Sequence, residues 1–492
     1  MKVTRVKFAV AAVAALALGT TMLSPAQSAT RSTVILHETN PITGLNCGMS
    51  ATNSTTCAAV SYLQGAGFYY YNNKKEVVPN TVFGSYKIVK NTKTDFRVQY
   101  TVNPGRVWSD GVPITGVDLL LSHVLSSSAY SIAAGLGDPK SKTAKPAFES
   151  LGYGGTYDDN VVGEPELSAD QMKVTIRYKM PIANWDLQGP GPSPVHTMIQ
   201  INDGDTKLGT VAEGNAAKAK FLAAFNAKDS TVLKALGKIW TNSYTITTVN
   251  SSTNPLLLVS NGGYIIDSAV AKTSVTLKKN AKYNSGPALQ GDIDTVVFKF
   301  IGDGTAAAQA LANGELDVYA GQATADGVAK LKAIKGVNVV GKEEVAYEHW
   351  DLHYDTVPGE DPYTGLFSVK DGAKSLALRR AFLLGIPRGE IMSKLIAPIN
   401  GVTKPIQSTW LAPGSAAYDK LVASNGSSYY SQGTQEERNK RALGLVQKYY
   451  PNALKNPLKV NVLVPGNNPR RAAEFALAKA NLAKAEKDLQ SS

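Results

Sequence analysis

Val107-Trp108-Ser109-Asp110-Gly111-Val112-Pro113-Ile114-Thr115-Gly116-Val117-Asp118 is the stretch of the chain that decides its fold. Its second half predicts the start of a helix that runs to about Leu125, because Thr115 is a good N-cap and Asp118 follows at the capping-box position. Its first half predicts a turn in which short polar side chains bond to nearby backbone groups and the indole ring packs inward. We therefore expect the Trp-Ser-Asp triplet of this turn to be structural rather than a ligand contact.

The segments on either side of this stretch predict an antiparallel sheet. Residues 86–89 and 95–102 alternate apolar and polar side chains around a turn signal at 91–94, which favours a hairpin with one face in water. Residues 172–179 alternate in the same way and predict a third strand.

Residues 96–100 followed by this stretch resemble a motif of the extracellular solute-binding family 5, the peptide- and nickel-binding family that serves ATP-driven importers. Gly116 stands where the family usually has Ala. Three further segments resemble motifs of the same family in the family's order, namely residues 280–283, 307–318 and 378–391. In the last of them Pro387 stands where Asp is commoner.

The resemblance implies an α/β fold of the type II periplasmic-binding-protein class, in which two lobes are joined by a hinge and an extra domain is inserted in lobe I. We expect the chain to be divided into a signal peptide at 1–29, the first part of lobe I at 30–75, the inserted subdomain at 76–197, the second part of lobe I at 198–287 and lobe II at 288–492. Family members usually continue for some tens of residues after the helix expected at 469–489. Lobe II is therefore expected to be shortened at its C-terminus.

The order of the predicted elements supports more than one domain, as does the length of 492 residues, which exceeds what one hydrophobic core usually serves. We expect strands at 33–36, 273–279, 295–300, 316–319 and 458–464, and helices at 216–239 (in two pieces), 305–313, 376–384, 436–449 and 469–489. The Asn-Ser-Gly-Pro break at 284–287 precedes an alternating β-α-β series of the kind found in mostly parallel sheets. It places the expected crossing between the lobes near 285–295.

The N-terminus predicts export. Three basic residues among the first seven precede the apolar run Phe8 to Leu18, and a stretch of small residues ends at Ala29. The alternative is a first transmembrane or core helix, but the run is shorter than the roughly 20 residues that a span needs. Loss of the signal lowers the formal net charge from +12 to +9. Because the basic residues are dispersed and no nucleic-acid motif accompanies them, we interpret this charge as solubility with a mild attraction to anionic surfaces.

The chain has two cysteines, Cys47 and Cys57. In an exported protein they predict a disulfide, and the alternative is a pair of unrelated free thiols. The five histidines are scattered, so the sequence offers no material for a structural zinc site, and we expect no metal and no cofactor.

The first candidate ligand-binding residues are Glu38, Thr39 and Asn40, in the loop that ends the first predicted strand. Loops at strand ends are where open α/β sheets place ligands, although ionisable groups there are equally often solvated. In the ligand-binding interpretation Glu38 pairs with an ammonium group and Asn40 bonds a peptide amide.

The second candidate group lies in residues 347–355, which concentrate aromatic and acidic side chains, and comprises Trp350, Asp351, His353 and Tyr354. Alternation predicts that Trp350, Leu352 and Tyr354 face one way while the other two face the opposite way with His349, so that only one set lines a cleft. Metal ligation by the two histidines is the alternative, because some relatives bind nickel chelates.

The third group is Asn467 and Arg470, in a turn that leads from a predicted buried strand into a helix N-terminus with free backbone N–H donors. In the dipeptide-binding members that the chain resembles, an Arg in this turn receives the carboxylate of the ligand. Arg470 and Arg471 lie near that position without clearly matching it.

These patterns predict an exported, monomeric binding protein that is extracellular, cell-surface or periplasmic. It captures oligopeptides or a similar small solute between two closing lobes and delivers them to the membrane permease subunits of an ABC importer. We expect no enzymatic activity and no nucleic-acid partner, since nucleophile-elbow, phosphate-loop and zinc-protease motifs are missing from the sequence. The alternatives are a secreted α/β hydrolase or sugar-processing enzyme and, at lower rank, a scaffold or sensor.

Overall fold

The computed structural model describes residues 32–490 except 74–75, 142, 341–346, 357–360, 410, 412, 414–415 and 454. The expected signal peptide lies outside the described residues, so its prediction stays untested. Among the helices that are described, none is long and apolar enough to cross a membrane.

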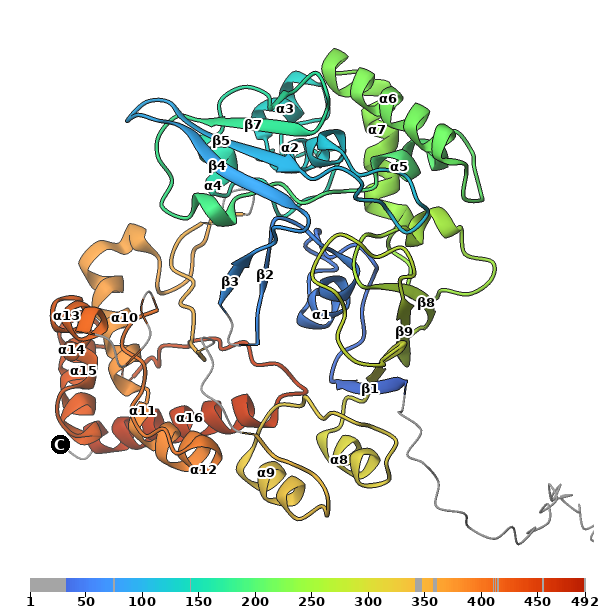
Figure 1. Ribbon diagram of the computed structural model, residues 1–492. Coiled ribbons are helices and arrows are strands. Elements are labelled where there is room, and N and C mark those ends of the chain that lie inside the picture. The colour runs from blue at the N-terminus through green and yellow to red at the C-terminus, as the bar shows by residue number, and fades with distance from the viewer. Residues whose placement is uncertain are drawn as a thin grey trace, which may run out of the picture.

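A mixed sheet, on the right-hand side of the view in Figure 1, contains the first strand of the chain. Its order is β1-β10-β9-β8, formed by Thr33–Glu38, Thr295–Phe300, Ser274–Lys279 and Tyr264–Val270. β1 runs parallel to β10, while β9 is antiparallel to both of its neighbours. Helix α1 (Thr55–Gln64) contributes Cys57 and Val60 to the core on this sheet, which also contains Val275, Leu277 and Phe298.

A second, antiparallel sheet follows the predicted hairpin. It has the order β4-β5-β7-β6, formed by Gly84–Asn91, Phe96–Val102, Lys173–Tyr178 and Glu166–Leu167. Alternate residues of β5 are buried because one face of the sheet packs on a large core and the other meets solvent. A two-stranded ribbon of β2 (Tyr69–Tyr71) and β3 (Val77–Pro79) lies between the two sheets in Figure 1.

Helices cover the buried face of this second sheet. They are α2 (Leu120–Val124), α3 (Ser128–Ala133), α4 (Thr156–Asn160), α5 (Val195–Asn202), α6 (Val211–Ala227) and α7 (Ser230–Lys238), with short turns η1 (Gly116–Leu119), η2 (Trp185–Leu187), η3 (Ile239–Ser243) and η4 (Pro255–Leu258). The helix expected at 216–239 in two pieces is confirmed as α6 and α7.

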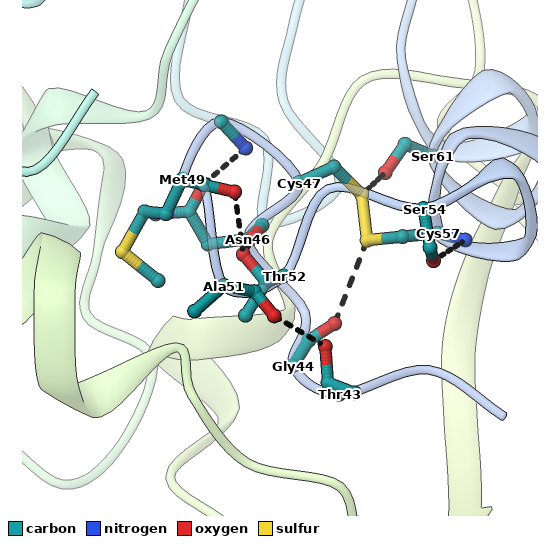
Figure 2. Close-up of a disulfide and its surroundings, with 11 residues drawn as sticks. Thr43, Gly44, Asn46, Cys47, Met49, Ala51, Thr52, Ser54, Cys57 and Ser61 are labelled. Atoms are coloured by element: carbon teal, nitrogen blue, oxygen red, sulfur yellow. Dashed lines mark hydrogen bonds between the residues drawn. A yellow bond between two sulfur atoms is a disulfide. The ribbon is translucent and has the colours of Figure 1, made fainter. Parts of the chain in front are cut away.

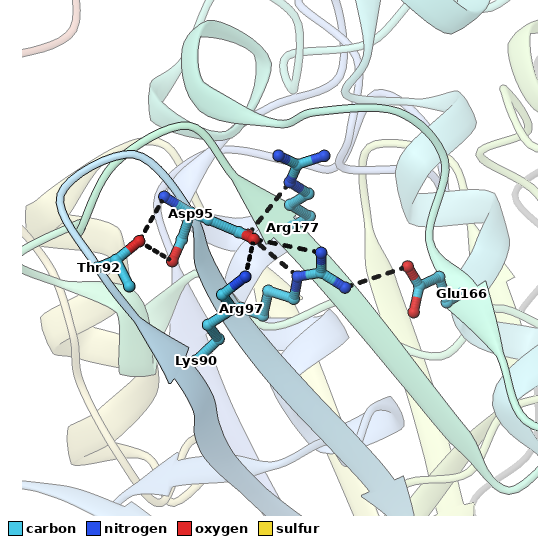
Figure 3. A network of polar contacts seen from close by, with 6 residues as sticks. All are labelled: Lys90, Thr92, Asp95, Arg97, Glu166 and Arg177. Carbon is cyan, nitrogen blue, oxygen red and sulfur yellow. Dashed lines mark hydrogen bonds and ion pairs between the residues drawn. The ribbon is translucent and has the colours of Figure 1, made fainter.

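An ion-pair network ties the strands of this sheet together (Figure 3). Asp95 accepts hydrogen bonds from Lys90 Nζ at 2.6 Å and from the guanidinium groups of Arg97 and Arg177 at 3.0 and 3.1 Å. The hydrogen bonds from Arg97 and Lys90 hold the pKa of Asp95 well below its usual range. Because the cations come from β4, β5 and β7, the carboxylate links three adjacent strands.

The stretch at 107–118 is a structural element, as its turn pattern predicts. The Trp108 side chain is 2% exposed, and Asp110 accepts from the Val112 N–H at 3.0 Å and from His196 Nε2 at 2.9 Å. The predicted capping box of Thr115 and Asp118 is present, although the first turn of the helix is the 3₁₀ turn η1.

The second half of the chain is mainly helical. Its elements are α8 (Gly304–Ala312), α9 (Ala325–Lys332), η5 (Val369–Asp371), α10 (Gly372–Gly385), α11 (Arg388–Ile391), η6 (Met392–Ile396), α12 (Ala397–Asn400), α13 (Ala416–Ser424), α14 (Ser428–Ser431), α15 (Gln435–Tyr449) and α16 (Pro469–Gln490). The helices expected at 305–313, 376–384, 436–449 and 469–489 are therefore confirmed.

Two strands expected in this half were predicted wrongly. Residues 458–464 have no regular secondary structure; Leu458, Val460 and Val462 pack on the core, but the segment joins no sheet of the described residues. Apolar alternation fixes which side chains point inward, whereas a strand also needs a hydrogen-bonded neighbour. Residues 316–319 form only an isolated bridge, in which Val318 pairs with Leu36 of β1.

The chain leaves the first sheet later than expected. β10 lies beyond the crossing predicted near 285–295, yet it is hydrogen-bonded between β1 and β9. The break at 284–287 therefore does not end the first sheet, which includes β10 and is contacted again by Val318. The division into lobes and an inserted subdomain stays a prediction in its boundaries.

Candidate functional site

The two halves of the chain meet at two of the predicted ligand residues. Asn467, in the turn before α16, donates from Nδ2 to Oδ1 of Asn40, in the loop after β1, at 3.0 Å. These residues are 427 positions apart in the sequence, and one follows a strand of the first sheet while the other precedes a helix N-terminus. The contact brings together two sequence-predicted groups that were proposed independently.

The β1 loop is held in place by the first turn of α1. Thr56 is fully buried, and its hydroxyl lies 2.9 Å from the backbone oxygen of Asn40 and 3.1 Å from Glu38 Oε2. Burial raises the pKa of Glu38, and the Thr56 hydrogen bond and the nearby His37 partly offset this effect. Thr39 lies between these two predicted residues and is partly exposed.

The predicted disulfide between Cys47 and Cys57 is present, with 5.7 Å between the two Cα atoms (Figure 2). Cys57 follows Thr56 directly in α1, whose N-cap Ser54 accepts from the Cys57 N–H. The covalent bond therefore ties the loop at 41–54 to the turn that supports Glu38 and Asn40.

His37 is a site residue that sequence reasoning missed. Its ring stacks on Tyr319 with 5.0 Å between ring centroids, and its Nε2 lies 2.9 Å from the backbone oxygen of Ile301. The side chain is 1% exposed, so it packs between the two segments that leave and re-enter the first sheet. The sequence signal was its place at the end of the first predicted strand, but only the fold shows which segments it joins.

The start of α16 carries the most concentrated charges of the site. Glu348 Oε2 lies 2.5 Å from Arg470 Nη2 and 3.1 Å from Arg470 Nε, while Glu348 Oε1 lies 2.5 Å from Arg471 Nε. The Gln322 amide oxygen, turned toward the guanidinium, accepts from both terminal nitrogens of Arg470 at 2.8 Å. Arg470 Nη1 also donates to the Ala323 backbone oxygen at 3.3 Å.

A second acid, Glu474, lies next to this cluster, and the pKa values of the two acids are shifted in opposite directions. Burial alone would raise the pKa of Glu348, but hydrogen bonds from Arg471 and Arg470 and their charges hold it below its usual value. Glu474, 3.5 Å from Arg470 Nε, is affected in the opposite direction, since burial and the charge of Glu348 raise its pKa to about 7. Sequence reasoning missed both acids because only the fold brings residue 348 to α16.

The predicted aromatic and acidic residues of 347–355 make their described contacts within the second half. Trp350 packs near Phe382 at 6.3 Å between ring centroids, and His353 stacks on Tyr363 at 4.4 Å. Tyr354 is 49% exposed, and the Arg379 guanidinium lies 5.5 Å from its ring centroid.

The alternation predicted for this segment holds for Trp350 and Leu352, which both pack on the core around Phe367 and Phe382. Asp351 pairs with His349 at 3.2 Å. The ligand-binding role of the segment stays a prediction. In the part of the chain that the structure covers, no three His, Cys, Asp or Glu side chains are grouped as metal ligands would be.

Two pockets lie away from this site, beside the antiparallel sheet and its helices. One of about 670 Å³ is lined by residues including Lys145, Glu149 and Lys238, and one of about 320 Å³ by residues including Ser126, Tyr157 and Gln188. Neither lining contains a predicted ligand residue. The candidate site is therefore the region where the halves meet, around Asn40 and Asn467, rather than either of these pockets. We call this region the seam.

An α/β protein of two lobes with strand-end loops facing the seam belongs to the hinged class of solute-binding proteins. The sequence model of the bacterial extracellular solute-binding proteins, family 5 (middle), matches residues 87–486, and the chain belongs to this family. Among curated proteins, no sequence matches the chain closely enough to add to this assignment.

Solved structures support the same fold at low sequence identity. A periplasmic EDTA-binding protein is 19% identical with a TM-score of 0.60, covering 93% of this chain and 73% of that one. An oligopeptide-binding protein from Thermus thermophilus in complex with a pentapeptide is 15% identical with a TM-score of 0.55, covering 92% and 71%. The oligopeptide-binding protein of Bacillus subtilis in complex with a nonapeptide is 13% identical with a TM-score of 0.54, covering 92% and 73%.

Proposed function

We propose that this chain captures oligopeptides, or a similar small solute, at the seam between its lobes and delivers them to the permease subunits of an ABC importer outside the cytoplasm. The observation that carries the proposal is the Asn40–Asn467 contact, which joins the strand-end loop of one half to the α16 turn of the other. A ligand that bonds to both sides of such a seam is bound more tightly when the halves close, so binding and closure are coupled.

The chemistry of the seam suits a peptide. The Glu38 carboxylate matches an ammonium group, and the amides of Asn40 and Asn467 can each donate to or accept from a peptide bond. Structural relatives that contain a pentapeptide or a nonapeptide support this ligand class. Membership of a binding-protein family supports a function without turnover of the ligand.

The test is binding of a random peptide mixture of two to nine residues, followed by native mass spectrometry and small-angle scattering. We expect bound peptides to be recovered intact and the radius of gyration to fall on binding. Cleaved products would favour the hydrolase alternative, and an unchanged radius with no bound mass would refute the proposal.

Variants locate the site within this experiment. Asn40→Ala and Asn467→Ala each remove one side-chain hydrogen-bonding group and should weaken binding about 2- to 10-fold, the effect of one hydrogen bond. Asn160→Ala is the matched control, since its side chain makes a solvent-exposed hydrogen bond within α4 to the Thr156 backbone oxygen. Equal affinities for all three variants would exclude the seam as the binding site.

A further inference from the structure

We infer that Glu348 is a specificity-determining residue whose carboxylate occupies the Arg470–Arg471 pair, so that the site selects peptides without using their C-terminal carboxylate. This inference rests on the proposed function. It adds that the site does not recognise the C-terminal carboxylate of a peptide. It predicts that a peptide acid and the corresponding peptide amide bind equally well.

The geometry of Glu348 is that of a bound carboxylate. One oxygen contacts Arg470 at 2.5 and 3.1 Å, and the other contacts Arg471 at 2.5 Å. Charge-assisted contacts of this kind are how arginines recognise carboxylates in general, including the end of a peptide. A side chain of the protein therefore already occupies the position that a ligand carboxylate would need.

The remaining donors of Arg470 are also engaged. Its terminal nitrogens donate hydrogen bonds to the Gln322 amide oxygen and the Ala323 backbone oxygen. The Arg470 side chain is only 18% exposed. Arg471 is 49% exposed, but Glu348 holds its Nε. A ligand carboxylate at Arg470 would therefore have to displace contacts that the protein already makes.

The charges of the cluster also oppose a second carboxylate. Glu348 is 20% exposed and Glu474 is 5% exposed, and both acids face the same guanidinium from different segments of the chain. An incoming anion would lie beside these acids, which already offset much of the positive charge of the two arginines, and would give up hydration in a poorly hydrated setting. The same cluster imposes no such penalty on a neutral amide end.

The experiment compares random pentapeptides synthesised as free acids with the same mixture synthesised as C-terminal amides, using competition detected by native mass spectrometry. For the wild-type protein we expect the two affinities to agree within about threefold. For the double variant Glu348→Gln, Glu474→Gln we expect the acids to bind at least about tenfold more tightly than the amides, because two arginines become available. Glu474 is changed as well because it lies close enough to replace Glu348 at Arg470.

One control variant and one further test variant accompany this comparison. Glu315→Gln breaks an exposed ion pair with Lys299 elsewhere in the chain and should leave the acid-to-amide ratio unchanged. Arg471→Ala keeps the Arg470–Glu348 pair and should leave the affinity for peptide acids within about threefold of wild type. This second variant tests the inference even where the double variant does not fold, which circular dichroism would reveal.

The outcomes separate the two proposals. A wild-type preference for acids of tenfold or more, an unchanged ratio in the folded double variant, or a tenfold loss of acid binding in Arg471→Ala would each overturn the role of Glu348 alone. A wild type that binds neither mixture would overturn the proposed function, and the inference with it.

Discussion

The two halves of this protein are packed in different ways. The antiparallel sheet and its helices enclose a large core that includes Phe83, Phe221 and Trp108, each at most 2% exposed. The helical half has smaller cores, around Phe367 and Phe382 and around Leu384, and Leu463 beside the first of them is fully exposed. The difference teaches that the first half is held together by one large apolar core, whereas the described apolar packing of the second half is divided among smaller clusters.

A buried ion pair of the first half and an exposed one of the second half show how burial changes the weight of the same contact. In the first half Lys218 Nζ lies 2.6 Å from Asp118, and both side chains are at most 6% exposed. In the second half Lys394 pairs with Glu390 one helical turn away at the same distance, but the side chains are 60% and 41% exposed. The same contact should therefore have very different energetic weight in the two settings.

The largest expected effect is the loss of stability on breaking the buried ion pair. Lys218→Met leaves the Asp118 carboxylate buried without its partner and should lower the free energy of unfolding by about 3–5 kcal/mol. Lys394→Met removes a solvated pair and should cost less than about 0.5 kcal/mol. Urea unfolding followed by tryptophan fluorescence measures both, and similar losses for the two variants would contradict the contrast between the buried and the exposed pair.

The disulfide gives the second-largest expected effect. It connects the stability of the first half to the position of Glu38 and Asn40 at the seam. Replacing Cys47 and Cys57 together by Ser opens a loop of ten residues and should cost about 2–3 kcal/mol through the greater freedom of the unfolded chain. Because Cys57 adjoins Thr56, peptide affinity should also fall as the Glu38 loop loosens.

Reductant provides the control for the disulfide. Wild type in reductant should lose about as much stability as the double Ser variant, and the variant itself should not respond to reductant. Equal stability of oxidised and reduced wild type would show that the bridge does not brace the loop.

Much of the first half was predictable from local sequence. The capping box at Thr115, the hairpin at 86–102 and the disulfide each depend on residues close together in the chain, and all three are present. The family motifs predicted the two-lobed fold in the same way, because they lie in contiguous segments.

The site was predicted only in part, for a physical reason. Strand-end loops and helix N-termini can be located from sequence, which is how Asn40 and Asn467 were found. Long-range packing decides the contacts that local sequence does not show. These are the contact between Asn40 and Asn467, the stacking of His37 on Tyr319, and the ion pair of Arg470 with Glu348. The wrong strand at 458–464 has the same origin, because strand pairing is also long-range.

The smallest expected effect concerns pH and the second half alone. The pKa of Glu474 is raised to about 7 from 4.5 because it is buried and faces the charge of Glu348. The folded state therefore binds this proton more tightly than the unfolded chain, so the stabilisation is complete below about pH 4.5 and is lost as the pH rises through 7. We expect a loss of about 1 kcal/mol or less between pH 5 and 8, since the charges of the two nearby arginines stabilise the ionised form of Glu474.

Comparison of the Glu474→Gln variant with wild type measures this effect on the free energy of unfolding. Its stability relative to wild type in urea unfolding should increase steadily from pH 5 to pH 8, because the amide does not ionise. Glu437→Gln is the matched control in the same half, since hydrogen bonds from the backbone and side chain of Thr434 lower the pKa of Glu437. That contribution is lost only as the pH falls below about 4.5, so the control should differ from wild type by a constant amount over this range. Parallel curves for Glu474→Gln and Glu437→Gln would mean that Glu474 is already ionised at pH 5, and that the two arginines outweigh both its burial and the charge of Glu348.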